Sequence, residues 1–141
     1  MKKPIFSIII PTYNQCDYLN IALKSVINQK FSNYEIIVID NFSNDKTNKV
    51  VENFKSKNIV YKKINNHGVI GKSRNEGIKL SSGKWIAFLD SDDIWHEEKL
   101  QKIYEMIKKR NFDVVCNDEY WIYKNKNKNK KIARYGPFKK N

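Results

Sequence analysis

Three carboxylates lie within four positions of one another, at Asp90, Asp92 and Asp93, directly after an apolar run. Carboxylates this close repel one another unless water or a cation neutralises them. Hard divalent cations prefer oxygen ligands, and Mg²⁺ commonly binds one or two carboxylates together with substrate phosphates. The spacing therefore predicts a metal–phosphate site. The alternative is that Asp92 or Asp93 caps the helix expected from His96.

Arg74 is a second candidate for contact with a phosphorylated ligand. Its guanidinium could hold a diphosphate with two parallel hydrogen bonds, whereas the alternative is an ion pair with Glu76 or a nearby Asp. The adjoining Gly71-Lys72-Ser73 is not a P-loop, because that motif needs a glycine five positions earlier and Asn66 stands there.

Asp40 and Tyr13 could contact a nucleoside. Asp40 ends the second apolar run, where it could accept hydrogen bonds from a ribose or a base, or form a turn with Asn41 and Ser43. Tyr13 could stack on a base or pack on the edge of a sheet. The two cysteines and two histidines lack the spacing of zinc ligands, so no structural zinc site is predicted.

The apolar pattern alternates between strand and helix. The expected strands cover residues 5–10, 34–39, 58–64, 84–89 and 113–116, and the expected helices cover 18–29, a segment after Asp45, 71–80 and 96–110. Asp17 is the expected N-cap of the first helix, and Asp45 that of the second. Such alternation indicates βαβ units. We therefore predict an α/β, Rossmann-like fold with a mainly parallel open sheet and helices on both faces.

Polar residues follow the strand ends of this predicted sheet. The first strand is followed by Pro11-Thr12-Tyr13-Asn14, the second by Asp40, and the fourth by Asp90-Ser91-Asp92-Asp93. In an open α/β sheet, ligands bind outside the carboxyl ends of the strands. Because the strands themselves are apolar, this convergence predicts one site at that edge.

Composition limits the classes of partner. The chain has 141 residues, which suits one domain, and a net charge of +12, which suits nucleic acid, an anionic membrane or a phosphorylated ligand. The excess Lys is spread along the chain and mixed with Asn, so we interpret it mainly as compositional bias on solvated faces. The one cluster, residues 124–131, has no aromatic residue for base stacking, and no nucleic-acid partner is expected.

No run reaches the roughly 18 apolar residues of a membrane span. We expect a cytoplasmic protein, with peripheral association at the inner face of the membrane left open.

Four segments together resemble glycosyltransferase family 2, which has the GT-A fold. They are SIIIPTYN, IIVIDNFSND, NHGVIGKSRNEGI and WIAFLDSDDIW, in the family's order and at compatible spacing, and the last contains a DxD motif. The resemblance covers roughly residues 5–120 and implies a site for a nucleoside-diphosphate sugar, with a UDP-sugar as the expected donor. The nucleotide-binding residues that it implies are Pro11, Thr12, Tyr13, Asn14, Asp40, Arg74, Asp90 and Ser91.

The same resemblance implies a metal and a reaction. Asp92, with Asp90, would bind Mn²⁺ or Mg²⁺ at the diphosphate, where the metal neutralises charge on the leaving phosphate. The family transfers sugars with inversion, typically in polysaccharide biosynthesis, so a glycan or lipid-linked acceptor is expected. A carboxylate on the acceptor side would remove the hydroxyl proton. Phe42 departs from the family pattern, which usually has Gly there, as do Ser73 for Ala and Glu97 for Pro.

Length is the larger departure, because family members continue into an acceptor-binding part that carries the base. We expect residues 1–120 to form the GT-A nucleotide-sugar-binding domain, and the Lys/Asn-rich segment 121–141 to begin a missing part. The catalytic base stays unassigned, since Asp118 and Glu119 directly follow the expected fifth strand. We therefore hypothesise a C-terminally truncated frame, a remnant or a fragment.

Two alternatives to an active transferase stay open. The first is a truncated, non-catalytic module that binds a nucleotide sugar without turnover. The second is a basic polyanion-binding protein, whose salt-dependent binding would survive the loss of Asp92. The clustering of acidic residues at strand ends favours a nucleotide-sugar site over a polyanion-binding surface.

Overall fold

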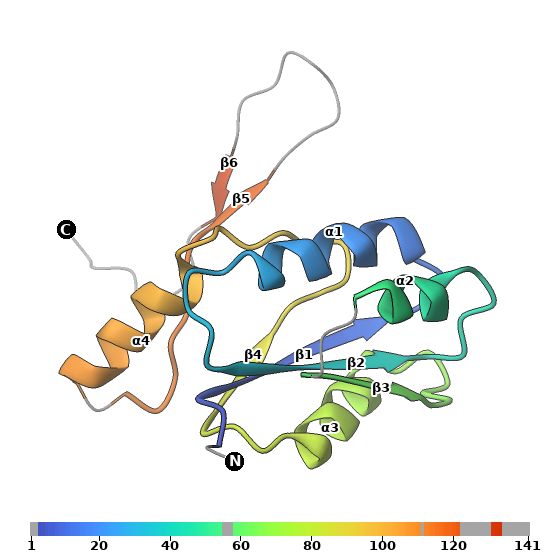
Figure 1. Ribbon diagram of the computed structural model, residues 1–141, viewed down its shortest axis with the longest axis horizontal. Helices are drawn as coiled ribbons and strands as arrows, with labels where there is room; N and C mark the ends of the chain where they lie inside the picture. Colours follow the sequence, from blue (N-terminus) through green and yellow to red (C-terminus); the bar gives the residue numbers. More distant parts are fainter. Residues whose placement is uncertain (1–2, 55–57, 111, 122–130, 134–141) are drawn as a thin grey trace. The chain divides into compact units, whose positions relative to one another are not determined.

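The computed structural model describes residues 3–54, 58–110, 112–121 and 131–133. The chain divides into two compact units, Met1–Lys102 and Ile103–Asn141. The first unit holds a sheet with helices packed on it (Figure 1), and the second holds a short strand pair. Helix α4 (Lys99–Lys109) begins in the first unit and continues into the second.

Four parallel strands form the sheet of the first unit, in the order β3-β2-β1-β4. They are β1 (Phe6–Thr12), β2 (Tyr34–Asp40), β3 (Ile59–Lys63) and β4 (Trp85–Phe88). Every residue of β1 and the last five of β2 are buried, as expected for central strands covered on both faces. The register pairs Thr12 with Asp40, so these two strands end level with each other.

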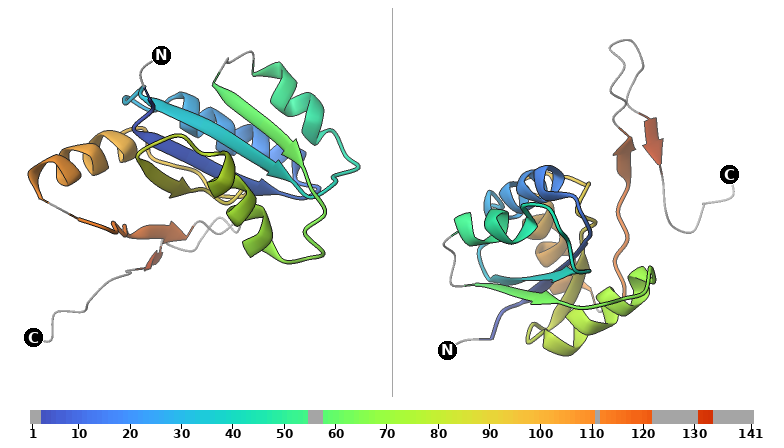
Figure 2. Two further views of the ribbon diagram at one scale, coloured as in Figure 1. Left: turned by 90° about the horizontal axis from the view of Figure 1, so that it is seen from below. Right: turned by 90° about the vertical axis from the view of Figure 1, so that its right-hand side faces the viewer.

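Helices cover both faces of this sheet. Helices α1 (Cys16–Ile27) and α2 (Thr47–Asn53) lie on one face, and α3 (Ile70–Leu80) lies on the other (Figures 1 and 2). The buried apolar residues of α1 recur at helical spacing, at Leu19, Ala22, Leu23 and Val26. The predicted α/β fold, with a parallel sheet and helices on both faces, is confirmed.

The amino ends of α1 and α2 share one carboxylate. Helix α1 begins at Cys16, so the predicted cap Asp17 lies inside the helix, and the Cys16 N–H donates to Asp45 Oδ2 at 2.9 Å. Asp45 Oδ1 accepts hydrogen bonds from the N–H and Oγ1 of Thr47, the first residue of α2. Burial raises the pKa of Asp45, but these hydrogen bonds outweigh burial and hold its pKa below the ordinary value. The prediction of Asp17 as cap is therefore wrong. The N-cap residue of α2 is Lys46 and not the predicted Asp45, but the Asp45 carboxylate accepts from the N–H of the first residue of each helix.

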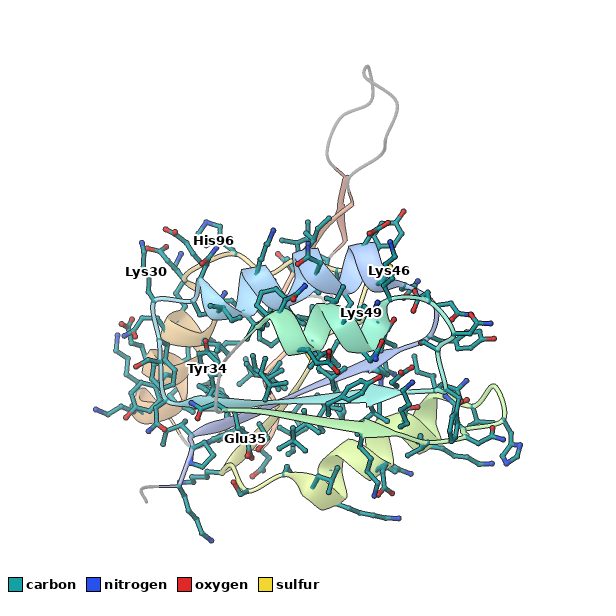
Figure 3. All side chains as sticks on the ribbon, turned by 45° about the vertical axis from the view of Figure 1, so that its right-hand side comes forward. Lys30, Tyr34, Glu35, Lys46, Lys49 and His96 are labelled. Carbon is teal, nitrogen blue, oxygen red and sulfur yellow. The ribbon has the colours of Figure 1, made fainter. Side chains whose placement is uncertain are left out.

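At the opposite edge of the sheet, Glu35 joins three strands. It lies at the start of β2 (Figure 3), and its Oε1 accepts hydrogen bonds from Ser7 Oγ at 2.5 Å, Ser82 N–H at 2.6 Å and Gly83 N–H at 3.2 Å. A Cβ on Gly83 would lie 2.7 Å from the Ser7 backbone nitrogen, so only glycine allows this close approach. Burial raises the pKa of Glu35, but the hydrogen bonds outweigh burial and lower its pKa below the ordinary value. These hydrogen bonds hold Ser82 and Gly83, which directly precede β4 (Trp85–Phe88), against β1 and β2.

The second unit contains an antiparallel pair, β5 (Glu119–Trp121) and β6 (Lys131–Ala133). The fifth strand predicted at 113–116 is wrong. Those residues form no regular structure, and Val114 is exposed, so the short β-branched run has no partner strand among the described residues. The tail expected from residue 121 includes β6, while residues 122–130 and 134–141 lie outside the described residues.

Candidate functional site

A cavity of about 450 Å³ lies at the carboxyl ends of the strands, a volume within the usual range for small-molecule sites. It is lined by the segments after β1, β2, β3 and β4 and by the first turn of α3, which is the edge that the sequence indicated. Among the predicted site residues, those that line it are Pro11, Thr12, Tyr13, Asp90, Ser91 and Asp92. Asn14, Asp40 and Arg74 do not line it.

Thr12 places an unsatisfied hydroxyl in the cavity wall. Its side chain is 5% exposed, and Oγ1 has no hydrogen-bond partner in the part of the chain that the structure describes. A buried polar group without a partner costs about 1–3 kcal/mol, so such groups in native proteins call for an explanation. A bound ligand that supplies the missing partner is one. The adjacent Tyr13 is 57% exposed and presents an aromatic ring at the same wall.

The wall of the cavity formed by Asp90, Ser91 and Asp92, which we call the acidic wall, is held by hydrogen bonds from Arg74 and to Gln15. Arg74 Nη2 donates to Asp90 Oδ1 at 2.7 Å, and the guanidinium lies over the ring of Phe88, 5.5 Å from its centroid. Ser91 Oγ donates to Gln15 Oε1, and Ser91 is buried. Asp92 is exposed within the cavity lining. Arg74 therefore forms an ion pair, the alternative raised above, and its partner is Asp90. Arg74 does not line the cavity itself but contacts Asp90, which does.

Two asparagine side chains, Asn41 and Asn66, form a further wall of the cavity, which we call the amide wall. This wall was not identified from the sequence. Asn41 Oδ1 accepts from the Asn66 N–H at 2.8 Å, and Asn66 Nδ2 donates to Ser73 Oγ at 2.9 Å. The Gly68 N–H donates to Asn66 Oδ1 at 2.8 Å. The cavity residues missed from the sequence are Gln15, Asn41, Asn66, Gly68, Ile70 and Ser73. Most of them follow a strand end or begin α3, and that position is the one sequence signal that could have found them.

Asp40 lies behind the cavity. It is fully buried, and its carboxylate accepts hydrogen bonds from Ser43 N–H at 2.8 Å, from Ser43 Oγ at 2.5 Å and from the Tyr61 hydroxyl. Lys63 Nζ lies 3.8 Å from it. Burial, and then the hydrogen bond to Asp40, raise the pKa of Tyr61 well above its ordinary value. The turn alternative holds, and the next residue, Asn41, takes the place at the cavity that was expected for Asp40.

Asn14 ties the loop after β1 to the loop after β2. Its N–H donates to Ser43 Oγ at 2.9 Å, and its Oδ1 accepts from the Asn44 N–H at 2.9 Å. Both Asn14 and Phe42 have positive φ angles, of 50° and 51°. Asn adopts this left-handed region readily, whereas a bulky residue such as Phe does so rarely. The two loops therefore hold each other beside Tyr13 and Asn41, which line the cavity.

The site offers few ligands for a metal. Within the described residues, no group of three or more His, Cys, Asp or Glu side chains is placed to hold an ion. Asp92 is exposed at the cavity, and Asp90 is paired with Arg74. Such a site fits Mg²⁺ or Mn²⁺ only where substrate phosphates complete the coordination, which is the usual arrangement for a magnesium–phosphate site.

The chain is similar to proteins of a known family. The profile of the family described as Glycosyl transferase family 2 matches residues 7–141. The chain belongs to this family, which the sequence motifs had indicated. WfgD of Escherichia coli, named a UDP-Glc:alpha-D-GlcNAc-diphosphoundecaprenol beta-1,3-glucosyltransferase, is 35% identical over 137 residues, which cover 96% of this chain and 52% of WfgD.

Solved structures share the GT-A fold. TarS of Staphylococcus aureus, a poly(ribitol-phosphate) beta-N-acetylglucosaminyltransferase, was crystallised with UDP-GlcNAc. It matches with a TM-score of 0.71 and 34% identity, over 77% of this chain and 32% of that one. The mannosyltransferase PcManGT from Pyrobaculum calidifontis, solved with GDP-Man and Mn²⁺, matches in fold with a TM-score of 0.68 at 19% identity, over 76% of this chain and 33% of its own. The chain thus spans about half or less of the length of these proteins.

The helices of this protein are short compared with a membrane span. Crossing the hydrocarbon core of a bilayer takes about 20 consecutive apolar residues. Within the described ranges, no helix is both long enough and apolar enough to cross a membrane.

Proposed function

We propose that the cavity binds a nucleoside-diphosphate sugar, with a UDP-sugar as the donor, and that the protein transfers the sugar to a glycan or lipid-linked acceptor. One observation carries the proposal: a buried hydroxyl without a partner, on Thr12, and an exposed carboxylate, on Asp92, line the same cavity. The family membership and the UDP-sugars named for WfgD and TarS support the choice of donor. The acceptor class follows the lipid-linked and polymeric acceptors in the names of these relatives.

Each wall has a proposed role. Tyr13 and Asn41 lie on adjoining loops after β1 and β2, so we assign them to the nucleoside, with Thr12 Oγ1 donating to it or to the ribose. Pro11 shapes this wall, and Asn14 holds it in place. Asp40 supports the base subsite from behind, through its turn with Ser43.

The acidic wall is assigned to the ribose and the diphosphate. Asp90 and Ser91 would face the ribose, and Arg74 would orient Asp90 through their ion pair. Asp92, with Asp90, would hold Mg²⁺ or Mn²⁺ against the diphosphate. When bound, the metal stabilises the negative charge that develops on the leaving phosphate. We propose inverting transfer, in which the acceptor hydroxyl attacks the anomeric carbon from the face opposite the diphosphate. A base on the acceptor side removes its proton.

Thermal unfolding of the purified chain with UDP, with and without Mn²⁺, tests the donor site. A ligand that binds only the folded state adds about 2.7 kcal/mol at a hundred times its Kd, which raises the Tm by several degrees for a domain of this size. We expect a Mn²⁺-dependent rise that is lost in Asp92→Ala. Glu52→Ala is the matched control, because Glu52 is an exposed acid on α2 that does not line the cavity.

Either of two results would count against this proposal. No UDP shift in a chain that melts cooperatively would remove the donor site. An equal shift in Asp92→Ala would remove the metal assignment and leave nucleotide binding in place. Transfer of labelled sugar to an acceptor by the purified chain separates an active transferase from a module that binds without turnover.

A further inference from the structure

The segment between β4 and α4 carries the acidic residues without helix or strand of its own. It begins at Leu89, whose N–H donates to Ile9 O at 3.1 Å, and it passes through Asp92 and Asp93, which are both exposed. Its next buried residue after Ser91 is Trp95. The Asp93 N–H donates to Asp90 O at 3.0 Å and closes a turn around Asp92, so the place of this carboxylate depends on where the segment that carries the turn is held.

Polar groups at and just after the carboxyl end of α1 supply the second anchor. Ser25 Oγ donates to Ala22 O at 2.7 Å and accepts from the Trp95 N–H at 3.1 Å. The backbone N–H of Lys30 donates to Glu97 O at 2.9 Å, and the labelled Lys30 and His96 lie near each other in Figure 3. Together with the bond from Ser91 to Gln15, these contacts fasten the segment along α1.

Gln29 is the centre of this anchor. Only 8% of it is exposed, and both ends of its amide are used. Nε2 donates to His96 O at 2.7 Å and to Ser25 O at 3.1 Å, while Oε1 accepts from the Leu100 N–H at 3.0 Å. One amide thus forms hydrogen bonds with a carbonyl just before α4, at His96, and with an N–H in the first turn of α4, at Leu100. Few side chains other than Gln combine a donor and an acceptor at this reach.

We propose that Gln29, assisted by Ser25, is a positioning residue that sets the place of Asp92 for the metal and the diphosphate. The inference rests on the proposed nucleotide-sugar site. Ligand groups must be held within about 0.5 Å of their working geometry, and residues that orient ligands typically affect metal affinity by about 10–100-fold. Gln29 touches neither ligand nor metal, and it acts through the backbone of the segment that carries Asp92.

The test compares Gln29→Leu with a control on the same helix. Gln29→Leu replaces the polar amide by an apolar side chain of similar size. Val26→Ala removes methyl groups from a fully buried side chain of α1, so it also lowers the Tm, but its side chain makes no hydrogen bond to the segment. Ser25→Ala is the milder second variant, to be used if Gln29→Leu does not fold.

Two readouts are taken on each protein. The first is amide hydrogen exchange of residues 91–100 in the ligand-free chain. The second is UDP affinity by calorimetry, in Mn²⁺ and in EDTA, expressed as the ratio of the two Kd values. In Gln29→Leu and Ser25→Ala we expect faster exchange in this segment. We also expect the gain in affinity from Mn²⁺ to fall, by about tenfold in Gln29→Leu. Val26→Ala should keep the wild-type ratio.

The outcomes separate the two proposals. Wild-type protein that does not bind UDP overturns the proposed function and the positioning role with it. Wild-type protein that binds UDP, beside a Gln29→Leu variant with an unchanged Mn²⁺ ratio, overturns the positioning role alone. A ratio that falls equally in Val26→Ala would mean that the effect is general loss of stability, and would also overturn it.

Discussion

Two glycines on α3 should respond to alanine with opposite signs. In an unstrained helix, Gly→Ala is stabilising by about 0.4–1 kcal/mol, because alanine loses less backbone entropy on folding. Gly71 is exposed, and a Cβ built there meets nothing within 4 Å, so Gly71→Ala should show this gain. At Gly77 a Cβ would lie 2.4 Å from Ile9 Cγ2 and 3.1 Å from two further atoms of that fully buried side chain.

The overlap at Gly77 decides the sign. Carbon atoms normally pack at about 3.5–4.0 Å, so the contact with Ile9 is more than 1 Å too short. Ile9 is β-branched and lies in the central strand β1, and overpacking of this kind costs about 1–3 kcal/mol. Once the helix-propensity gain of about 0.4–1 kcal/mol is subtracted, Gly77→Ala should be destabilising by up to about 2.6 kcal/mol. Urea unfolding of both variants measures this. If Gly77→Ala were as stabilising as Gly71→Ala, the close approach of α3 to β1 would be refuted.

Three further predictions follow from single groups. Thr12→Val removes the unpartnered hydroxyl, so the free energy of unfolding should rise by about 1 kcal/mol while UDP affinity falls; calorimetry showing unchanged affinity would contradict the assignment. Asp45→Ala should be destabilising by about 1–2 kcal/mol in urea unfolding, since Cys16 and Thr47 lose their acceptor; a loss below about 0.3 kcal/mol would speak against the shared cap. Glu35 has a folded pKa below its ordinary 4.5, so its contribution is present above that pH and lost as the pH falls through the folded pKa. The stability advantage over Glu35→Gln should therefore be complete above about pH 6 and shrink as the pH falls below the ordinary pKa of 4.5, and a constant difference would be inconsistent with the lowered pKa.

The sheet could be predicted from the sequence because its strands are read from local pattern. Continuous apolar runs, residues 8–11 and 36–39, lie within β1 and β2, and such runs indicate central strands buried on both faces. The run at 113–116 has a similar apolar pattern but is shorter. Residues with high β propensity do not form a strand without a partner strand to pair with, and none is found among the described residues. Asp17 had the right type and place for a cap, but Asp45, from a distant loop, supplies the acceptor instead.

The lining of the cavity was predicted in part. Asp90 and Asp92 could be predicted because they are charged, and Thr12 and Tyr13 because they lie at the end of a strand. Asp40 carries the same charge, yet it is buried in a turn, and sequence pattern does not distinguish a carboxylate that faces a cavity from one that faces the protein. The amide wall around Asn66 was missed because amides are common in loops, and their role depends on which strand ends lie together.

The proposed function requires that the cavity at the strand ends binds a nucleoside diphosphate. Titrating UDP with Mg²⁺ into the ¹⁵N-labelled chain, and following the amide chemical shifts, tests it most directly. We expect saturable shifts of Thr12, Tyr13, Asn41, Gly68 and the segment 90–92, which line the cavity, with little change around Glu35 and Gly83 at the amino ends of the strands. Shifts confined to surface lysines, fading with added salt, would contradict it and point to binding of the polyanion by charge alone.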